Sequence, residues 1–595
     1  MNFDYFVLPF CIGALILFTI LSTRYAMWIV KLPRIDKRKA WLGILKFKFI
    51  GSIWEVFRES LLHRKIFKIN AMLGWMHMSF AFGWFLLIVI GAMESKFHKS
   101  RVFNMPYDPI FLRYFEHNTH GFFFAEGFTF IMDLILLILL TATILAISKR
   151  VYSNLFGLKR TTKLILGDKI ALYSLWTIFP LRFLAESFTS GLYNNGGFLT
   201  GTFGNIFASF LPLQMLEYPF WWAYSSALCL FFIFLPFSRY MHIPTEIFLI
   251  YLRNCGIRTS KNHTGYTEFE IYSCSRCGIC IDKCQLTDVM QNKTQGVYFI
   301  QQIRRNILSS ETAYNCLLCG RCTTYCPVGI DINKVRLLKR HDFAPENGFN
   351  FNYLDEKVTV APFEYDVIYF AGCMTHLTPT IKNSMVKILN KSGDRYIFLD
   401  KEGSICCGKP LLFAGNEKQA RELKYENKKL INKTGAKTLV TSCPICYNIF
   451  KNEYNLTIEV LHHSQYIKRL IENKKITLSK SQLNVVYHDP CELSRTNNVY
   501  DEPREILNAI ANLQTTNHEK DNALCCGGSL GNFVISETER NKITNNMVAK
   551  LSEHKPDVIV TACPLCKKTM NKQSDVPIND ISELVSNAIL QEKNY

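Results

Sequence analysis

The sequence lacks the glycine-rich fingerprint of a dinucleotide-binding fold. No G-x-G-x-x-G opens a βαβ pattern in its 595 residues. Such a run is what lets a cofactor pyrophosphate approach a helix N-terminus closely. A flavin or nicotinamide cofactor would therefore have to come from a partner protein.

Acidic residues are scarce relative to basic ones. The chain has 49 Asp and Glu against 68 Lys and Arg, for a formal net charge of +19. Much of this excess lies in loops beside long apolar segments, where anionic lipid attracts basic side chains. The Lys-rich stretch at 417–434 is most simply a solvated helix face, although it could dock an acidic partner. Because the sequence contains no nucleic-acid motif, we expect no nucleic-acid partner.

Basic residues are also missing ahead of the first apolar segment, so we expect no cleaved signal peptide there. Residues 1–5 carry none, whereas Arg24 and Lys31 follow the segment. Long apolar runs recur through the first 240 residues, each near the roughly 20 residues that a bilayer crossing requires. We predict five membrane spans, near residues 5–23, 70–92, 127–148, 170–190 and 219–240.

The charge of the connecting loops predicts how these spans are oriented. Residues 24–68 carry twelve Lys or Arg against three acids, and the loop after the third span is also basic. Residues 193–219 contain no Lys or Arg. Basic loops favour the cytoplasmic side. We therefore expect a bacterial or archaeal cytoplasmic membrane, with the N-terminus outside and everything after residue 240 inside.

Ten of the 21 cysteines form two copies of one pattern. Each copy has a single cysteine, an adjacent pair followed by glycine, and a C-P-x-C motif, and corresponding cysteines lie 118 to 120 residues apart. That constant offset indicates a duplicated domain. Five thiolates are one more than a tetrahedral zinc site or an ordinary four-iron cluster needs. The two sets are Cys373, Cys406, Cys407, Cys443 and Cys446, and Cys491, Cys525, Cys526, Cys563 and Cys566.

Eight further cysteines form two C-x2-C-x2-C-x3-C runs. These runs are typical of two-cluster ferredoxins rather than of zinc ribbons or disulfides, and the fourth cysteine of each run binds the other cluster. The first run is followed by Gln285 where the second has Pro327, a departure that changes no ligand. We therefore predict two 4Fe-4S cubanes, one held by Cys274, Cys277, Cys280 and Cys326, the other by Cys316, Cys319, Cys322 and Cys284.

Only Cys11, Cys229 and Cys255 remain without an assignment. The first two lie in apolar runs and are most simply small core residues. A chain with this many thiols needed as iron ligands is suited to a reducing compartment. The cysteine-bearing half should therefore face the cytoplasm, in agreement with the loop charges.

Two histidines lie at similar depth on the predicted cytoplasmic side: His77 in the second span and His242 at the end of the fifth. One b-type haem needs such a pair as axial ligands, but histidines hydrogen-bonded to helix carbonyls explain them equally well. Arg182 and Glu186 lie one turn apart in the fourth span. They are candidates for a quinone site, although an internal ion pair explains them as well.

With His77 and His242 so placed, residues 1–245 resemble the five-span cytochrome b subunit of respiratory nitrate reductase and its relatives in heterodisulfide reductases. That family has two histidines ten residues apart on the second span and two eighteen apart around the fifth. Here one of each pair is replaced, by Leu87 and Tyr224, and both missing histidines would have bound the outer haem. The resemblance therefore implies an all-α five-helix bundle with one haem b, on the cytoplasmic side.

In the C-terminal half, apolar strands lead directly into cysteines, at residues 366–373, 438–443, 484–491 and 557–563. Amphipathic helices lie between them, for example at 418–432 and 537–551. We therefore expect two α/β domains whose ligands gather at the carboxyl ends of parallel strands. The sequence His488-Asp489-Pro490 could place a proton donor near the second set, or only end a strand. Ahead of these domains, helices near 297–308 and 332–339 predict a small, mainly α ferredoxin domain.

Residues 265–595 resemble the catalytic iron–sulfur subunit of heterodisulfide reductase, on the strength of the complete C…CCG…CxxC patterns. The resemblance implies a noncubane cluster in each five-cysteine (CCG) domain and a catalytic role for those ten cysteines in splitting a disulfide. The same domain occurs in glycolate and lactate oxidase iron–sulfur subunits and in membrane electron-transfer-flavoprotein:menaquinone oxidoreductases. The cofactor class therefore follows more securely than the substrate.

The sequence thus predicts a multidomain membrane oxidoreductase. The domains are a cytochrome b domain at 1–250, a ferredoxin domain at 251–350, and CCG domains at 360–478 and 479–595. The first hypothesis is a heterodisulfide reductase-like enzyme that couples menaquinone to a cytoplasmic thiol/disulfide or related couple, with Hdr-like cytoplasmic subunits as partners. The alternative is an electron conduit from an electron-transfer flavoprotein, or another soluble flavoprotein, to the menaquinone pool.

Overall fold

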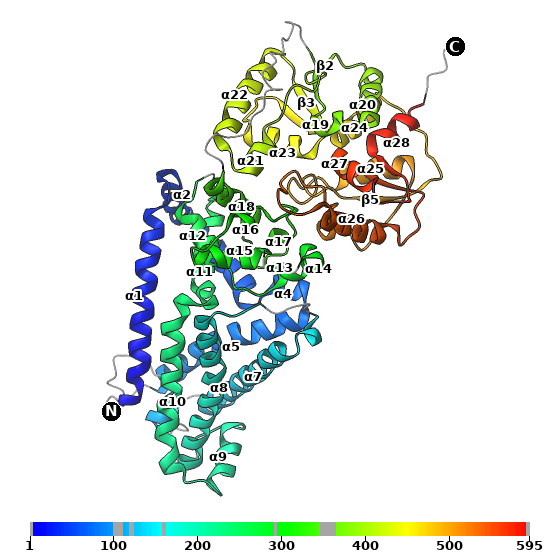
Figure 1. The fold of residues 1–595 in the computed structure, drawn as a ribbon. Coiled ribbons are helices and arrows are strands. Elements are labelled where there is room, and N and C mark those ends of the chain that lie inside the picture. The colour runs from blue at the N-terminus through cyan, green and yellow to red at the C-terminus, as the bar shows by residue number, and fades with distance from the viewer. Residues whose placement is uncertain are drawn as a thin grey trace. The chain divides into compact units, whose positions relative to one another are not determined.

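The computed structural model describes residues 4–98, 111–117, 124–157, 162–260, 262–290, 294–344 and 365–590. The chain divides into two units. Figure 1 shows the fold coloured by residue number from the N-terminus to the C-terminus. One unit comprises residues 1–282 and 325–330, and the other comprises 283–324 and 331–595. The predicted domain boundaries remain predictions, and the one predicted between residues 350 and 360 lies outside the described residues.

Among the described residues, the regular structure of the first unit is helical, with no β-strand. In its bundle α8 packs against α9 and α10, α5 against α7, and α1 against α10. Leu87, Phe179, Trp221 and Phe231 lie in the apolar core of this bundle and are almost fully buried. The helices are α1 (Leu8–Val30), α2 (Arg34–Leu45), α3 (Lys48–Val56), α4 (Arg64–Ile69), α5 (Ala71–His98), α6 (Leu112–Phe115), α7 (Ala125–Val151), α8 (Leu166–Tyr193), α9 (Thr200–Ala208), α10 (Leu213–Phe234), α11 (His242–Asn254), α12 (Gly265–Tyr272) and α13 (Ile279–Asp282).

Four helices among the described residues are long and apolar enough to cross a membrane, which indicates a membrane-anchored protein. They are Tyr5–Val30, Ala71–His98, Ala125–Val151 and Leu213–Phe237. The remaining predicted span corresponds to α8, which has 28 residues. Arg182 and Glu186 lower the apolar character of α8, so the predicted count of five spans is not confirmed.

The fifth predicted span differs from the structure at its end. Helix α10 ends at Phe234, and two short 3₁₀ turns, Leu235–Phe237 and Arg239–Met241, follow it. Pro236 contributes to this change because proline has no N–H to continue the helical ladder. His242 is therefore the first residue of α11 rather than the last turn of the fifth long helix.

The second unit begins with short helices around four of the ferredoxin cysteines, Cys284, Cys316, Cys319 and Cys322. The fully buried guanidinium of Arg336 holds them together, because it stacks 4.1 Å from the Phe299 ring centroid and donates to the carbonyl oxygen of Thr294 at 2.8 Å. These bonds satisfy loop carbonyls that would otherwise be buried without a donor. The helices are α14 (Leu286–Val289), α15 (Gly296–Arg304), α16 (Ser310–Tyr314), α17 (Arg321–Thr324) and α18 (Ile332–Arg340).

Two parallel four-stranded sheets follow, with the same topology: β2-β1-β3-β4 and β6-β5-β7-β8. This identity agrees with the duplication. The first sheet contains β1 (Val367–Phe370), β2 (Tyr396–Phe398), β3 (Thr438–Thr441) and β4 (Glu459–His462), with α19 (Cys373–His376), α20 (Pro379–Ser392), α21 (Lys409–Ala414), α22 (Glu417–Lys433), α23 (Pro444–Glu453) and α24 (His463–Glu472). The second contains β5 (Asn484–His488), β6 (Asn512–Gln514), β7 (Val558–Thr561) and β8 (Ile578–Asp580), with α25 (Asp501–Ile510), α26 (Glu537–Ser552), α27 (Pro564–Met570) and α28 (Ile581–Ala588).

Side-chain alternation along the strands separates two interiors. Val367 and Tyr369 of β1 point into an apolar core that also contains Val485 and Tyr487 of β5, so the two copies share it. Ile368 of β1 points the other way, into the core that contains Cys443 and Cys446. One face of each sheet thus joins the copies, and the other supports the cysteines.

Candidate cluster and haem sites

Strand ends bring the first five-cysteine set together. Because β1 and β3 are paired in register, with Phe370 opposite Thr441, the loops that carry Cys373 and Cys443 leave the sheet side by side. Cys443 is the N-cap residue of α23, and Pro444 occupies the first helical position, where its missing N–H is not needed. The local sequence therefore ends the strand and starts the helix at the cysteine.

All five thiols of this set interact with one another. Cys407 interacts with Cys406 and Cys446, and the neighbours of Cys373 include Cys443 and Cys407. Gly372 has φ +85°, and a Cβ there would lie 2.9 Å from the Cys446 Sγ. The site thus has the donors for an iron–sulfur cluster and a glycine where a side chain would intrude.

The second set repeats this arrangement and lines a cavity of about 30 Å³. Cys525 interacts with Cys491 and Cys526, and Cys566 interacts with Cys526 and Cys563. In both copies the glycine after the pair donates its backbone N–H toward the first thiol at 3.5 Å, from Gly408 to Cys406 and from Gly527 to Cys525. Donors of this kind suit a thiolate that binds metal.

The two predicted ligand sets of the ferredoxin region fall in different units. Cys274, Cys277, Cys280 and Cys326 all belong to the first unit, where Cys326 interacts with Cys277 and Cys274. The second set lies in the second unit and lines another cavity of about 30 Å³, formed in part by Cys284, Cys316, Cys319 and Cys322. Each unit therefore contains one complete set of four.

One ferredoxin set contacts the second CCG set. The Cys319 thiol interacts directly with the Cys525 thiol. Gln285 makes two hydrogen bonds to the Cys525 backbone, and Arg495 donates to the carbonyl oxygens of Cys319 (2.9 Å) and Ala523 (2.8 Å). Electrons could therefore cross between these two cysteine sets over a short distance.

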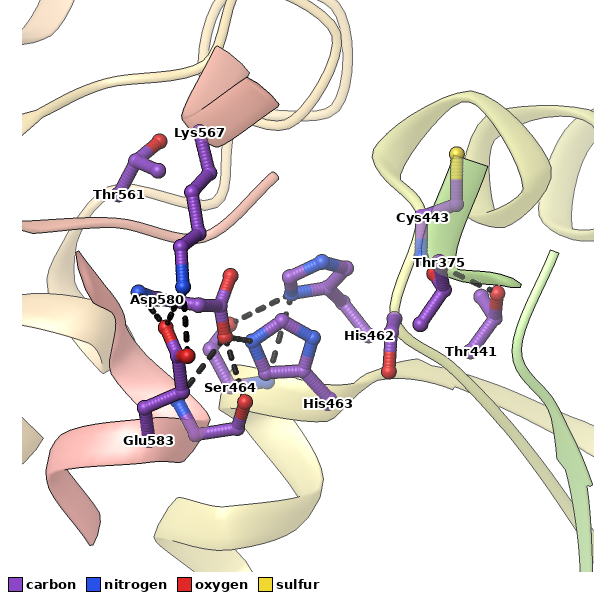
Figure 2. A network of polar contacts seen from close by, with 12 residues as sticks. Thr375, Thr441, Cys443, His462, His463, Ser464, Thr561, Lys567, Asp580 and Glu583 are labelled. Atoms are coloured by element: carbon purple, nitrogen blue, oxygen red, sulfur yellow. Dashed lines mark hydrogen bonds and ion pairs between the residues drawn. The ribbon is translucent and has the colours of Figure 1, made fainter. Parts of the chain in front are cut away.

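A buried polar network lies between the two copies (Figure 2). His463 Nε2 is 3.3 Å from the Asp580 carboxylate, and both side chains are fully buried. Beside them, the His462 ring interacts with the backbone of Ser442 and Ala562, the residues that precede Cys443 and Cys563. Burial first, and then the neighbouring His463, hold the pKa of His462 well below its usual value, so this imidazole is neutral.

The first unit contains a cavity of about 420 Å³, in the size range of cofactor sites. His77, His242 and the ferredoxin ligand Cys277 line it. The His77 Nε2 is buried and has no hydrogen-bond partner among the described residues. The His242 Nδ1 lies 2.7 Å from the carbonyl oxygen of Arg239.

Basic side chains line the same cavity, and the sequence analysis did not identify them. They are Lys149, Arg150 and Arg239. A third histidine, His63, also lines it and stacks on His77 with ring centroids 5.5 Å apart. The donor set fits a haem, with imidazoles for iron and cations for propionates. His63 lies in the basic loop before the second span. In the sequence, only its position 14 residues before His77 could have indicated that it belongs to this cavity.

Leu87 and Tyr224, which replace the outer-haem histidines of the cytochrome b family, lie in the packed aromatic core of the bundle. Leu87 and Tyr224 are 1% and 3% exposed, and Tyr224 contacts the rings of Phe111 and Trp221. Arg182 and Glu186 form the internal ion pair that the sequence allowed, with Nη2 2.8 Å from Oε1. Their interaction with each other explains their burial without a ligand.

Family comparisons agree with the two cysteine patterns. A cysteine-rich domain model (CCG) matches residues 367–451 and 485–571, and a 4Fe-4S dicluster domain model matches residues 270–330. These matches support iron–sulfur clusters in the C-terminal half of the chain.

Several curated proteins are similar to this chain. EtfAB:quinone oxidoreductase of Syntrophomonas wolfei is 24% identical over 91% of this chain and 91% of the relative. A subunit of the dihydromethanophenazine:CoB–CoM heterodisulfide reductase of Methanosarcina barkeri is 26% identical over 56% of this chain and 97% of the relative. The iron-sulfur-binding oxidoreductase FadF of Bacillus subtilis is 22% identical over 78% and 83%. The chain is therefore an iron–sulfur oxidoreductase similar to this heterodisulfide reductase subunit and to EtfAB:quinone oxidoreductase.

Proposed function

We propose that this protein transfers electrons between menaquinone and a cytoplasmic redox partner, using one haem b, two 4Fe-4S cubanes and two noncubane CCG clusters. When bound, these groups supply one-electron transfer. The observation that carries the proposal is the single cavity that His77, His242 and Cys277 line together. It would bring a haem next to the first ferredoxin cluster within one unit.

The residues of the chain have three roles in this proposal. His77 and His242 bind the haem iron, and Lys149, Arg150 and Arg239 neutralise its propionates. The eighteen assigned cysteines bind iron. Arg495 donates hydrogen bonds to the carbonyl oxygens of Cys319 and Ala523 and so holds Cys319 against the loop of Cys525. This contact would keep the path between the second cubane and the second CCG cluster short.

As partner we propose a soluble electron-transfer flavoprotein. The electron conduit, which was the alternative from the sequence, is thus placed ahead of the heterodisulfide reductase-like enzyme. The relative named EtfAB:quinone oxidoreductase matches 91% of this chain, including the helical region, whereas the heterodisulfide reductase subunit matches 56%. The absence of a dinucleotide fingerprint from the sequence also requires that flavin be supplied by a partner.

Membrane placement completes the proposal. The four apolar helices, with α8 packed among them, would form the bundle. Loop charge orients the N-terminus outside and the iron–sulfur region in the cytoplasm. Arg182 and Glu186 remain candidates for the quinone site, but a quinone would have to break their ion pair to bind there. Mutation of the haem cavity therefore tests the proposed electron path more directly.

The deciding experiment reduces the purified protein with a menaquinol analogue and follows haem absorbance. Addition of an oxidised electron-transfer flavoprotein should reoxidise the haem, and His77→Leu and His242→Leu should abolish its absorbance. His554→Leu, at an exposed position, is the matched control and should keep the full spectrum. Absence of haem from the wild-type protein would refute the cytochrome part of the proposal.

A second candidate function is disulfide reduction at the CCG clusters. Both five-cysteine sets are complete, and the heterodisulfide reductase relative is covered over 97% of its length. In the same assay a small disulfide, rather than the flavoprotein, would then reoxidise the haem. Cys443→Ser and Cys563→Ser should each remove about four iron atoms per chain, the content of one cluster.

A further inference from the structure

His488 is a buried imidazole next to the second CCG cysteine set. It is the last residue of β5 and is 1% exposed. Its Nε2 has no hydrogen-bond partner among the described residues. The ligand atoms of His488, Cys526 and Cys566 all lie within 4.8 Å of one another. A buried nitrogen without a partner is costly, so its position against two thiols calls for a function.

At the equivalent strand position the first copy has a phenylalanine instead of this imidazole. The register of the strands makes Phe370 the counterpart of His488, because Phe370 pairs with Thr441 in one sheet as His488 pairs with Thr561 in the other. The Phe370 ring packs against Phe450 at 4.9 Å, within the apolar core that contains Cys443 and Cys446. The two copies therefore share their cysteines and their glycine N–H donor but differ in this side chain beside the cysteines.

His488 is held in place rather than free to turn away. Its backbone carbonyl accepts from Thr561 Oγ1 at 3.4 Å, and the strand on which it lies is paired on both sides. The following residue, Asp489, has a structural role, since it accepts two hydrogen bonds from Arg504, at 2.9 and 2.6 Å. Of the His-Asp-Pro sequence, only the histidine faces the cysteines as a polar group with an unused nitrogen.

We propose that His488 donates an N–H hydrogen bond to the Cys526 thiolate of the second CCG cluster and thereby raises its reduction potential above that of the first. This inference rests on the proposed function, because it requires a cluster at the five cysteines. The five cysteines already supply one thiolate more than an ordinary four-iron cluster needs, so we assign the imidazole as a donor to sulfur rather than as an iron ligand. Such a bond stabilises the added electron on an anionic cluster, and the buried, apolar surroundings strengthen it.

The consequence is a division of labour between two copies of one domain. The second cluster lies next to Cys319 and would have the higher potential, so it would hold an electron that arrives from the second cubane. The first cluster, surrounded by Phe370 and other apolar side chains, would be the stronger reductant of the pair. His488 is thus a tuning residue and not a group that reacts.

The test is a redox titration of the full-length purified protein, followed by EPR, with two reciprocal variants. His488→Phe gives the second copy the residue of the first, and it should lower the midpoint potential of the second CCG cluster alone. Phe370→His should raise the potential of the first cluster. Because Phe370→His alters the other copy, it tests the proposal even if His488→Phe fails to assemble its cluster. His488→Gln keeps an N–H donor and should restore most of the wild-type potential.

A spectroscopic readout separates the outcomes. With 15N-labelled histidine, pulsed EPR of the reduced second cluster should detect a weak nitrogen coupling that His488→Phe removes. Two intact CCG clusters whose potentials do not change in either reciprocal variant would overturn the inference. A strong coupling typical of iron-bound nitrogen would overturn it as well, because His488 would then be a ligand. If the wild-type protein contains no second CCG cluster, it is the proposed function that fails.

Discussion

The side-chain amide of Gln285 pairs with the backbone of Cys525 in both directions. Its Nε2 donates to the Cys525 carbonyl oxygen at 3.1 Å, and its Oε1 accepts from the Cys525 N–H at 2.7 Å. Gln285 directly follows Cys284, a predicted ligand of the second cubane, and Cys525 is a predicted ligand of the second CCG cluster. Gln285, which stands where the second ferredoxin run has Pro327, therefore links the two predicted ligand sets. The replacement of proline by glutamine in the first run thus has a structural consequence, although it changes no ligand.

Replacing Gln285 with leucine should destabilise this junction. The N–H and carbonyl of the buried Cys525 would lose their partners, at a cost of about 1–3 kcal/mol. We expect a lower melting temperature and slower reduction of the second CCG cluster, measured by thermal unfolding and freeze-quench EPR. Gln482→Leu is the control, because Gln482 is exposed. Equal behaviour of the two variants would mean that the amide pairing contributes nothing.

Removing the charge of Asp168 should destabilise the first unit strongly. Its carboxylate forms a fully buried ion pair with Arg276, which lies beside Cys277, and accepts from the Arg239 N–H at 2.7 Å. Asp168→Asn would leave the Arg276 charge buried without its partner, which costs about 3–5 kcal/mol.

The measurement is thermal unfolding in detergent, with haem content followed in parallel. Asp36→Asn is the matched control, since Asp36 forms an ion pair with Lys39 at the surface of α2, at 3.3 Å. Exposed pairs contribute little, so this control should melt close to the wild type. If Asp168→Asn melts with it, the Arg276 charge is compensated by another group.

Local sequence predicted the elements well, since the apolar runs of β1 and β5 and the amphipathic period of α22 are properties of short segments. The five-cysteine sets were found from their repeated spacing along the chain, and in each copy the C-P-x-C motif lies between a strand and the helix that it begins. Gln285 and His63 could not be found in this way. Their roles depend on contacts with distant segments, 240 residues away for Gln285 and Cys525. The count of five spans is not confirmed at α8, because Arg182 and Glu186 lower the apolar character of this helix.

Stability of the second unit should fall as the pH drops below about 6.5. Burial lowers the pKa of His462 in the folded state, whereas the unfolded chain has an ordinary histidine pKa of about 6.5. Below that value the unfolded state binds the extra proton, and each unit of pH then costs up to about 1.4 kcal/mol of stability until the folded-state pKa is reached. Above about 6.5 both states are neutral and this dependence vanishes.

His462→Asn should flatten the acid side of the profile. Asparagine can still accept the N-cap hydrogen bond that His462 Nδ1 accepts from the Ser464 N–H at 3.3 Å, but it does not titrate. Unfolding midpoints between about pH 5 and 8 provide the measurement, with His554→Asn at an exposed position as control. A profile as steep as that of the wild type would assign the pH dependence to other groups.

Substituting Gly372 should remove the first CCG cluster alone. At φ +85° any other residue is strained, and a Cβ would lie 2.9 Å from Cys446 Sγ and 3.1 Å from Cys443 Cβ, both in the ligand set.

Gly393 is the control that separates backbone strain from crowding of the cysteines, since it has φ +74° and a Cβ there would meet nothing within 4 Å. Gly393→Ala should therefore cost about 1 kcal/mol of stability with full iron content. Gly372→Ala should lose about four iron atoms and the EPR signal of the first cluster, and keep that of the second, where Pro490 occupies the equivalent position. Full iron content in Gly372→Ala would mean that the cysteines shift to accommodate the methyl group, and that the close approach of this backbone is not required for the cluster.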